Sequence, residues 1–288
     1  MKKKIIVFFV ACAVLSAIGV IFITFSSSNK KRGREDSLPL FEGEKISSEY
    51  ELCSDENDFE YVDKREEDEE ETIELSFGDD EKYSSKQVHY SGVHLKPREI
   101  SSVKETAYVI PVEYKGNKIS DIECIQKVIG VKIIYYPDEC IAFASVSLCS
   151  DLEEIYVSKD SDFSITSFIT ECDKLKKIYV SKDNRSVCFP RVDQCLQLNE
   201  VYLQDSVKVL DRNFTSCIEL KTISLPDGLE IINNSFISLW KLEKLVIPES
   251  VRYISGSFVD CPKLTLVVAK GSYAEKYAIE HNLKFETR

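Results

Sequence analysis

The sequence has 288 residues and a formal net charge of −12, and its charges are distributed unevenly. Residues 1–34 hold seven basic and no acidic residues, and residues 35–82 hold 21 acidic and four basic residues. Residues 83–288 are nearly neutral, with 26 basic and 28 acidic residues, so this part lacks the basic surface of a nucleic-acid-binding protein. Because the three histidines lie outside the repeats described below, we predict neither a metal nor another cofactor.

The N-terminus contains a candidate membrane segment. Residues 1–4 are a basic leader, and residues 5–25 are 21 uncharged residues, enough to cross a hydrocarbon core about 30 Å thick. We predict a cytoplasmic leader at 1–4 and an uncleaved signal anchor at 5–25. Two alternatives stay open, namely cleavage near Ala11–Ala13 and lipidation of Cys12. Basic residues flank the segment on both sides, so the predicted extracellular position of the rest relies on the N-terminal placement of the anchor.

An acidic spacer follows the membrane segment. Residues 26–82 are rich in Glu, Asp and Ser, and residues 66–71 form an uninterrupted acidic run. Such a composition lacks the apolar density that offsets the entropy of ordering, so we predict a disordered spacer extended by self-repulsion. A tract that binds cations or a partner is the alternative, although no EF-hand spacing is present.

Residues 83–130 are predicted to form an N-terminal cap region. The stretch from Tyr108 to Pro111, the turn at Gly116–Asn117 and the return through Ile119 and Ile122 indicate a hairpin. Such a hairpin covers the open end of a repeat array, whose first unit otherwise exposes a core face.

Residues 131–270 contain a nine-residue phrase that occurs six times, after one degenerate copy. Its starts lie 23, 23, 22, 22 and 22 residues apart. The six copies are CSDLEEIYV from Cys149, CDKLKKIYV from Cys172, CLQLNEVYL from Cys195, CIELKTISL from Cys217, LWKLEKLVI from Leu239 and CPKLTLVVA from Cys261. A period in this range is typical of leucine-rich repeats, so we predict a repeat solenoid of the α/β type with a parallel sheet on one face.

The fourth, seventh and ninth residues of each phrase are apolar and predict the core. The last two alternate with an outward residue, which is the period of a strand. In the last phrase these core residues are Leu264, Val267 and Ala269. A second apolar set on the return path, such as Leu229, Ile232 and Phe236, should fill the interior from the opposite side.

The stretch PDGLEIINNSFISLWKLEKLVIPESVRYISGSFVDCPKL resembles the BspA-like leucine-rich repeats, whose units read approximately F-x-x-C-x-x-L-x-x-I-x-I-P-x-x-V-x-x-I. The match is strongest from Cys195 to Leu264 and looser from Val131 to Asp193. The resemblance covers about 160 residues and neither the anchor nor the spacer. It implies a bacterial, often surface-exposed protein used for adhesion or for binding host proteins, and no shared catalytic residue.

Residues 271–288 are predicted to form a helical C-terminal cap. Ser272 and Glu275 have the spacing of a capping box, in which each side chain satisfies a free amide at the helix N-terminus. Asn282 suits the left-handed residue that ends such a helix, and Leu283 and Phe285 offer a last strand.

Five cysteines occupy the first position of the phrase, while Leu239 occupies it in the fifth copy. We interpret them as buried thiols that pack like small apolar side chains. Disulfides between neighbouring repeats are an alternative, and Cys124 and Cys140 form a second candidate pair.

The eighth, outward position of the phrase gives the candidate binding site. It is occupied by Tyr156, Tyr179 and Tyr202, and by Tyr135 in the degenerate copy before them. Tyrosine is favoured on recognition surfaces, so we predict that these four residues contact a ligand. The alternative is a row of stacked rings that stabilises neighbouring strands without contacting a ligand.

These observations predict a membrane-anchored surface protein that binds a protein or a glycan and is not an enzyme. The sequence has no G-x-S-x-G motif, no Gly-rich phosphate loop and no H-E-x-x-H motif. The alternative function is a scaffold or accessory subunit of a cell-envelope complex that has no external ligand.

Overall fold

The computed structural model describes residues 51–53, 59–65, 69–77, 81–89, 92–97, 101–110, 112–114, 117–122, 124–141, 143–164 and 166–288. The predicted leader and anchor at 1–4 and 5–25, including Cys12, lie outside the described residues. Within the described part, no helix is both long and apolar enough to traverse a bilayer.

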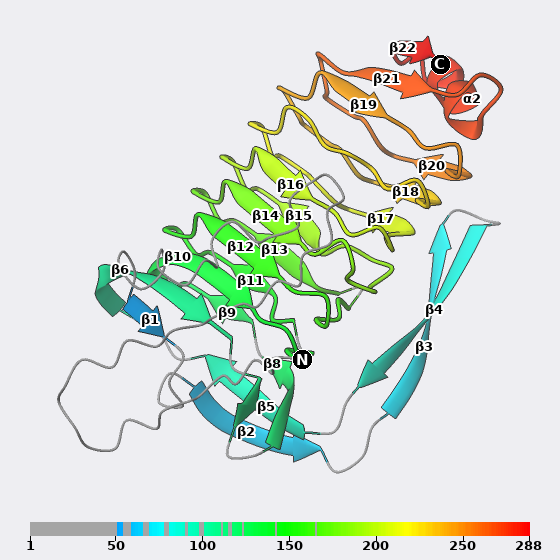
Figure 1. Cartoon of the computed structure of the whole chain (residues 1–288). Coiled ribbons are helices and arrows are strands. Elements are labelled where there is room, and N and C mark those ends of the chain that lie inside the picture. Colours follow the sequence, from blue (N-terminus) through cyan, green and yellow to red (C-terminus); the bar gives the residue numbers. More distant parts are fainter. Residues whose placement is uncertain are drawn as a thin grey trace, which may run out of the picture.

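From residue 101 onwards the chain forms a stacked series of coils in which equivalent strands pair in parallel (Figure 1). The first sheet has the order β1-β6-β10-β12-β14-β16 and continues, beyond one coil without a strand there, as β19-β21-β22. Its strands are β1 (Glu51–Cys53), β6 (Ser101–Val109), β10 (Ile129–Tyr136), β12 (Glu154–Val157), β14 (Lys177–Val180), β16 (Glu200–Tyr202), β19 (Lys244–Val246), β21 (Thr265–Val268) and β22 (Phe285–Thr287).

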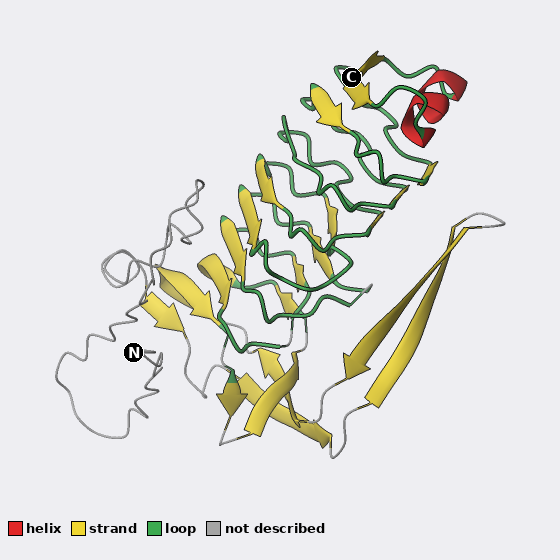
Figure 2. Ribbon diagram, turned by 45° about the vertical axis from the view of Figure 1, so that its right-hand side comes forward, coloured by secondary structure: helices red, strands yellow, loops and turns green. Residues whose placement is uncertain are grey.

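Two further rows of short parallel strands form the other faces of the coils (Figure 2). One row comprises β9 (Ile125–Gln126), β11 (Val146–Ser147), β13 (Phe168–Thr170) and β15 (Arg191–Asp193). The other comprises β17 (Val209–Asp211), β18 (Ile231–Asn233) and β20 (Tyr253–Ser255). The fold is therefore a leucine-rich-repeat-like solenoid built of β-strands, with little helix in its described part, and the predicted repeat array is confirmed.

One apolar cluster runs through the coils from Tyr108 to Ala278. It contains the predicted core residues of the first five phrases, with Leu203 and Leu225 half-buried, and the return-path residues Leu229, Ile232 and Phe236. Burial of these side chains stabilises the array by about 25 cal/mol for each Å² of apolar surface removed from water.

The prediction for the last phrase is wrong by one residue. Leu245 pairs with Leu266 and Val246 pairs with Val267, so Leu266 and Val268 join the core cluster while Val267 takes the outward position. The reason is that the last coil has one residue fewer between Leu264 and its strand core than the preceding coil has after Leu242.

A hairpin does lie before the repeats, in residues 113–122. β7 (Glu113–Tyr114) pairs antiparallel with β8 (Asn117–Ile122), as the turn residues predict. Tyr108, however, belongs to β6 and pairs with Ile134 of β10, so the parallel sheet begins earlier than expected.

Strands also lie within residues 26–82, where composition predicts a disordered spacer. Besides β1 they are β2 (Phe59–Arg65), β3 (Glu69–Phe77) and the start of β4 (Glu81–His89), and β2 pairs with β5 (Gly92–Pro97). β3 and β4 form a two-stranded hairpin. The physical reason is visible in β3, where Ile73, Leu75 and Phe77 alternate with polar residues at the period of a strand.

The C-terminal cap forms as predicted. Helix α2 (Tyr273–Glu280) begins at Ser272, whose Oγ accepts a hydrogen bond from the Glu275 amide at 3.2 Å. The Glu275 carboxylate accepts from the Gly271 amide at 2.6 Å, and Asn282 has a left-handed φ of 52°. Phe285 then enters β22, which pairs in parallel with β21.

Candidate functional site

The register of the first sheet places the four predicted tyrosines in one row. Tyr135 pairs with Tyr156, Tyr156 with Tyr179 and Tyr179 with Tyr202 on consecutive parallel strands. This tyrosine row arises because each strand carries its Tyr at the same position, between two side chains that enter the core.

Exposure changes sharply along the tyrosine row. Tyr135 is 3% exposed and Tyr156 is fully buried, both in a small cluster with Ala107 and Ile133 that lies apart from the main core. Tyr179 is half-buried and Tyr202 is 48% exposed. Only Tyr179 and Tyr202 are therefore accessible to a ligand, whereas Tyr135 and Tyr156 contribute to packing.

The rings of the row contact one another through tilted pairs. The centroids of Tyr156 and Tyr179 lie 6.0 Å apart, and those of Tyr179 and Tyr202 lie 5.7 Å apart. Both distances suit favourable aromatic contacts. The stacking that the sequence leaves as an alternative is thus present from Tyr156 to Tyr202.

Two charged residues, Lys177 and Glu200, lie on the same face as the tyrosine row and contact its rings and hydroxyls. The ammonium of Lys177 lies 5.5 Å from the ring centroid of Tyr156 and 5.7 Å from that of Tyr202, within cation–π range of both. Glu200 lies 3.9 Å from this ammonium and accepts a 3.4 Å hydrogen bond from the Tyr202 hydroxyl. The site predicted from the sequence does not include Lys177. Its two-residue separation from Tyr179 is the signal that places both side chains on one face.

Burial at the N-terminal end of the row also affects its acidity. Burial first, and then the hydrogen bond to the Glu154 carboxylate, raise the pKa of Tyr156 well above its usual value. Tyr156 therefore remains neutral at physiological pH. The exposed end of the row offers the rings and hydroxyls of Tyr179 and Tyr202, the Lys177 ammonium and the Glu200 carboxylate.

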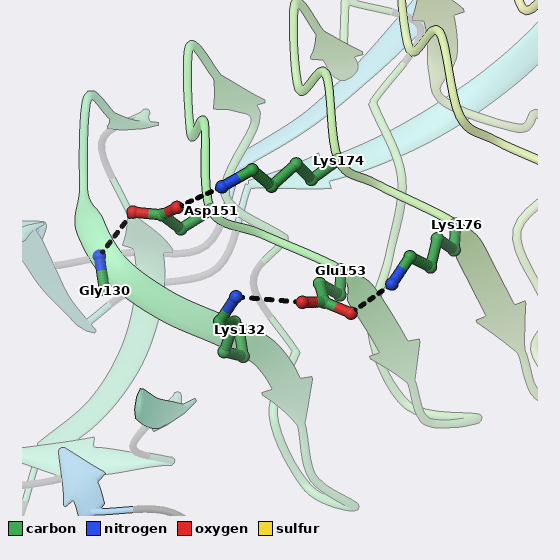
Figure 3. A network of polar contacts seen from close by, with 6 residues as sticks. All are labelled: Gly130, Lys132, Asp151, Glu153, Lys174 and Lys176. Atoms are coloured by element: carbon green, nitrogen blue, oxygen red, sulfur yellow. Dashed lines mark hydrogen bonds and ion pairs between the residues drawn. The ribbon is translucent and has the colours of Figure 1, made fainter. Parts of the chain in front are cut away.

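The first coils are bordered by a network of charges that bridges neighbouring repeats (Figure 3). Glu153 binds Lys132 at 2.9 Å and Lys176 at 2.5 Å, each from an adjacent coil. Asp151 accepts a 2.8 Å hydrogen bond from Lys174 and a 3.1 Å bond from the Gly130 amide.

These contacts lower the pKa of the two carboxyl groups. The Lys174 hydrogen bond, followed by the Gly130 amide, lowers the pKa of Asp151, and the Lys176 and Lys132 hydrogen bonds lower the pKa of Glu153. Because each charge in the network has an opposite partner, we assign it to coil stacking rather than to ligand recognition.

The cysteines of the phrase form no disulfides and are mostly buried, as expected, and the candidate pair Cys124 and Cys140 is not bridged by a disulfide. Each phrase thiol donates to the carbonyl two residues before it, at 3.3 Å from Cys149 to Ser147 and 3.4 Å from Cys172 to Thr170. Within the described residues, no group of three or more His, Cys, Asp and Glu residues is arranged to hold a metal ion.

The comparisons with known proteins agree with the repeat pattern. The family model for the BspA type leucine rich repeat region matches residues 185–283 in six copies. The comparison with curated proteins finds no match.

Two solved structures are similar. A leucine-rich repeat protein of T. pallidum, TpLRR, is 16% identical with a TM-score of 0.27, covering 60% of this chain and 63% of its own. A leucine-rich repeat protein from Bacteroides ovatus ATCC 8483 is 16% identical with a TM-score of 0.24, covering 69% of this chain and 70% of its own. The match thus spans less than two thirds of the first protein's own length. On the family match, residues 185–283 are similar to leucine-rich repeats of the BspA type.

Proposed function

We propose that this chain is a non-catalytic binding protein that holds a protein or glycan ligand at the exposed end of its tyrosine row. Repeats of the BspA type are generally involved in binding. The observation that carries the proposal is the accessible pair Tyr179 and Tyr202, held in place by the neighbouring strands and flanked by Lys177 and Glu200.

The chemistry of this surface suits recognition rather than catalysis. Exposed tyrosine rings bind apolar groups and sugar faces, and their hydroxyls bind polar groups. The row changes beyond Tyr202 to Ser224 and to Val246, which is exposed, so the aromatic surface is confined to one part of the sheet. A rigid sheet of this kind reduces the entropic cost of binding.

The binding test compares two tyrosines of similar exposure at different places. Binding of the wild-type chain, Tyr202→Ala and Tyr273→Ala to a panel of immobilised matrix proteins and glycans is measured by surface plasmon resonance. Tyr202→Ala should raise the Kd of any ligand found by about 10-fold or more, as for an interface anchor, while Tyr273→Ala on helix α2 leaves it unchanged. Equal Kd values for the two variants would remove the sheet face from consideration.

We further propose that residues 5–25 anchor the chain in the cell membrane with the repeats outside, where a ligand can reach them. Protease treatment of intact cells, followed by detection of the repeats with an antibody, tests this placement. Protection of the repeats in intact cells, with digestion after lysis, would contradict it and would favour a scaffold role inside the cell envelope.

A further inference from the structure

A second surface, the turn that leads into the first sheet, is apolar in the C-terminal coils. The second residue of the phrase is Leu196, Ile218, Trp240 and Pro262 in four consecutive coils. Leu196 is 40% exposed, Trp240 is 60% exposed and Ile218 is half-buried. Val259, in the turn that also contains Pro262, is 49% exposed. We call these five residues the turn ridge. Single exposed apolar residues are ordinary on proteins, but a contiguous row of them marks an interaction site.

The repeat itself does not require apolar residues at this position. The first two coils carry Ser150 and Asp173 there, and both coils close with the same geometry as the others. Two other features hold the turn. The first residue of the phrase, a Cys or Leu239, packs in the core, and the residue before it has a left-handed backbone, as Ser216 does with φ of 56°. The apolar row is therefore an addition to the fold rather than a part of its core.

Hydrogen bonds between coils hold the turn ridge in place. The Gln194 amide donates to the Thr215 carbonyl at 2.9 Å, the Ser216 amide to Ile237 at 2.9 Å and the Ser238 amide to Val259 at 2.8 Å. Each turn is thus fixed to the next, at about 4.8 Å per coil. A surface that is already ordered loses little conformational entropy when it binds.

The side chains next to the turn ridge indicate its partner. Glu219 and Lys241 flank it on neighbouring coils and lie 2.6 Å apart. Trp240 is the one aromatic residue of the turn ridge and the other four are aliphatic, so a sugar would meet a single ring and few polar groups. An anionic lipid surface needs a basic face, whereas the charge pair here is balanced. Rotated by 180° about an axis between these two coils, the pair complements itself, because Glu219 of one copy faces Lys241 of the other.

We propose that the turn ridge binds a second copy of this chain in an antiparallel, two-fold arrangement. In it Ile218 of one copy lies opposite Trp240 of the other, and Leu196 lies opposite Pro262, so the same patch serves both partners. A contact of this limited size gives a weak, concentration-dependent dimer. The turn ridge lies apart from the tyrosine row, so this inference is independent of the proposed ligand site.

The test is cross-linking of the full-length chain in mild detergent with a short bifunctional maleimide. In the proposed dimer of Ile218→Cys, the new thiols of the two copies are one coil apart, which is an offset of about 5 Å along the ridge. Ser150 occupies the same turn position far from the two-fold axis, so the two thiols of Ser150→Cys would be offset by about 34 Å. We expect Ile218→Cys to give a covalent dimer at several times the yield of the unsubstituted chain. Ser150→Cys should not exceed the unsubstituted chain.

A second variant separates the turn ridge from any association through other parts of the chain. Adding Trp240→Ser to Ile218→Cys should lower the dimer yield at least 5-fold, because Trp anchors dominate small interfaces. Circular dichroism verifies that the variants fold. Equal yields from Ile218→Cys and Ser150→Cys, or a yield that Trp240→Ser leaves unchanged, would overturn the proposal.

Discussion

The buried thiols of the phrase show how one residue type affects both packing and pH behaviour. Burial is the leading cause that raises the pKa of Cys217 to about 12, and it does the same for Cys188, a buried thiol outside the phrase. An ordinary thiol has a pKa of about 8.5, so these side chains stay protonated and unreactive in the folded chain. In Cys149 the hydrogen bond with the Cys172 thiol is the first cause of a pKa that is also raised.

A pH dependence of stability follows from these thiols. The raised folded pKa contributes stability that is fully present below about pH 8.5 and is lost as the pH rises toward 12, because the unfolded thiol ionises first. For Cys217 we expect a loss of about 1 to 2 kcal/mol between pH 8 and pH 10. The measurement is the free energy of unfolding in urea at both pH values for the wild type and Cys217→Ala. The variant should show a shallower decline, and identical slopes would contradict the assignment.

The sequence predicts where the tyrosine row lies, but it does not predict which of its tyrosines are exposed. The repeat period places Tyr135, Tyr156, Tyr179 and Tyr202 on one face of the sheet. The burial of Tyr135 and Tyr156 depends on Ala107, which comes from β6, a strand that the repeat pattern does not mark. Local periodicity specifies which face a side chain occupies, but not what packs over that face.

At the scale of elements, the coils are joined by a row of aromatic rings on the return path. Phe163, Phe189, Phe214, Phe236 and Phe258 are consecutive members, with centroids 5.5 Å to 6.2 Å apart. A polar row runs beside them. The backbone N–H of Asn213 donates to Ser235 Oγ at 3.1 Å, and the backbone N–H of Ser235 donates to Ser257 Oγ at 3.0 Å.

The sequence indicates only part of this aromatic row. Phe214, Phe236 and Phe258 follow from their 22-residue spacing, whereas Phe163 and Phe189 depart from it. The Asn or Ser before Phe214, Phe236 and Phe258 is the sequence signal for the polar row. The left-handed backbone of these turns was not predictable, because Phe214 with φ of 60° and Phe236 with φ of 59° are not residues that favour it. Stacking against neighbouring coils imposes that conformation.

Phe214 is the member of the aromatic row whose loss should be most costly. It is fully buried, and its ring lies 5.7 Å from that of Phe189 and 5.5 Å from that of Phe236. Phe214→Ala should lower the free energy of unfolding by about 3–5 kcal/mol, because it leaves a cavity between two coils. Urea denaturation measures the loss, with Tyr273→Ala, which truncates an exposed ring, expected to cost less than about 0.5 kcal/mol. Equal costs for the two variants would show that the row does not support the array.

The whole molecule behaves as a one-dimensional array, since each coil contacts mainly the coils before and after it. Its C-terminal end is covered by helix α2, from which Tyr277 packs edge-on against Phe258 with centroids 6.3 Å apart. Ala274 and Ala278 of the same helix belong to the main core cluster. Ser272 and Glu275 start helix α2, and the buried face of that helix then covers the last coil.

Tyr277→Ala should therefore destabilise the array from its C-terminal end. Amide hydrogen exchange, read by mass spectrometry, should show faster exchange in β20 and β21, a smaller change in β18, and little change in β12 and β14, because stability in a solenoid is transmitted through neighbouring coils. Ile279→Ala, at an exposed position of the same helix, is the matched control and should leave exchange at its wild-type rate. A uniform increase along all coils in Tyr277→Ala would indicate a single cooperative unit, in which the cap stabilises distant and adjacent coils alike.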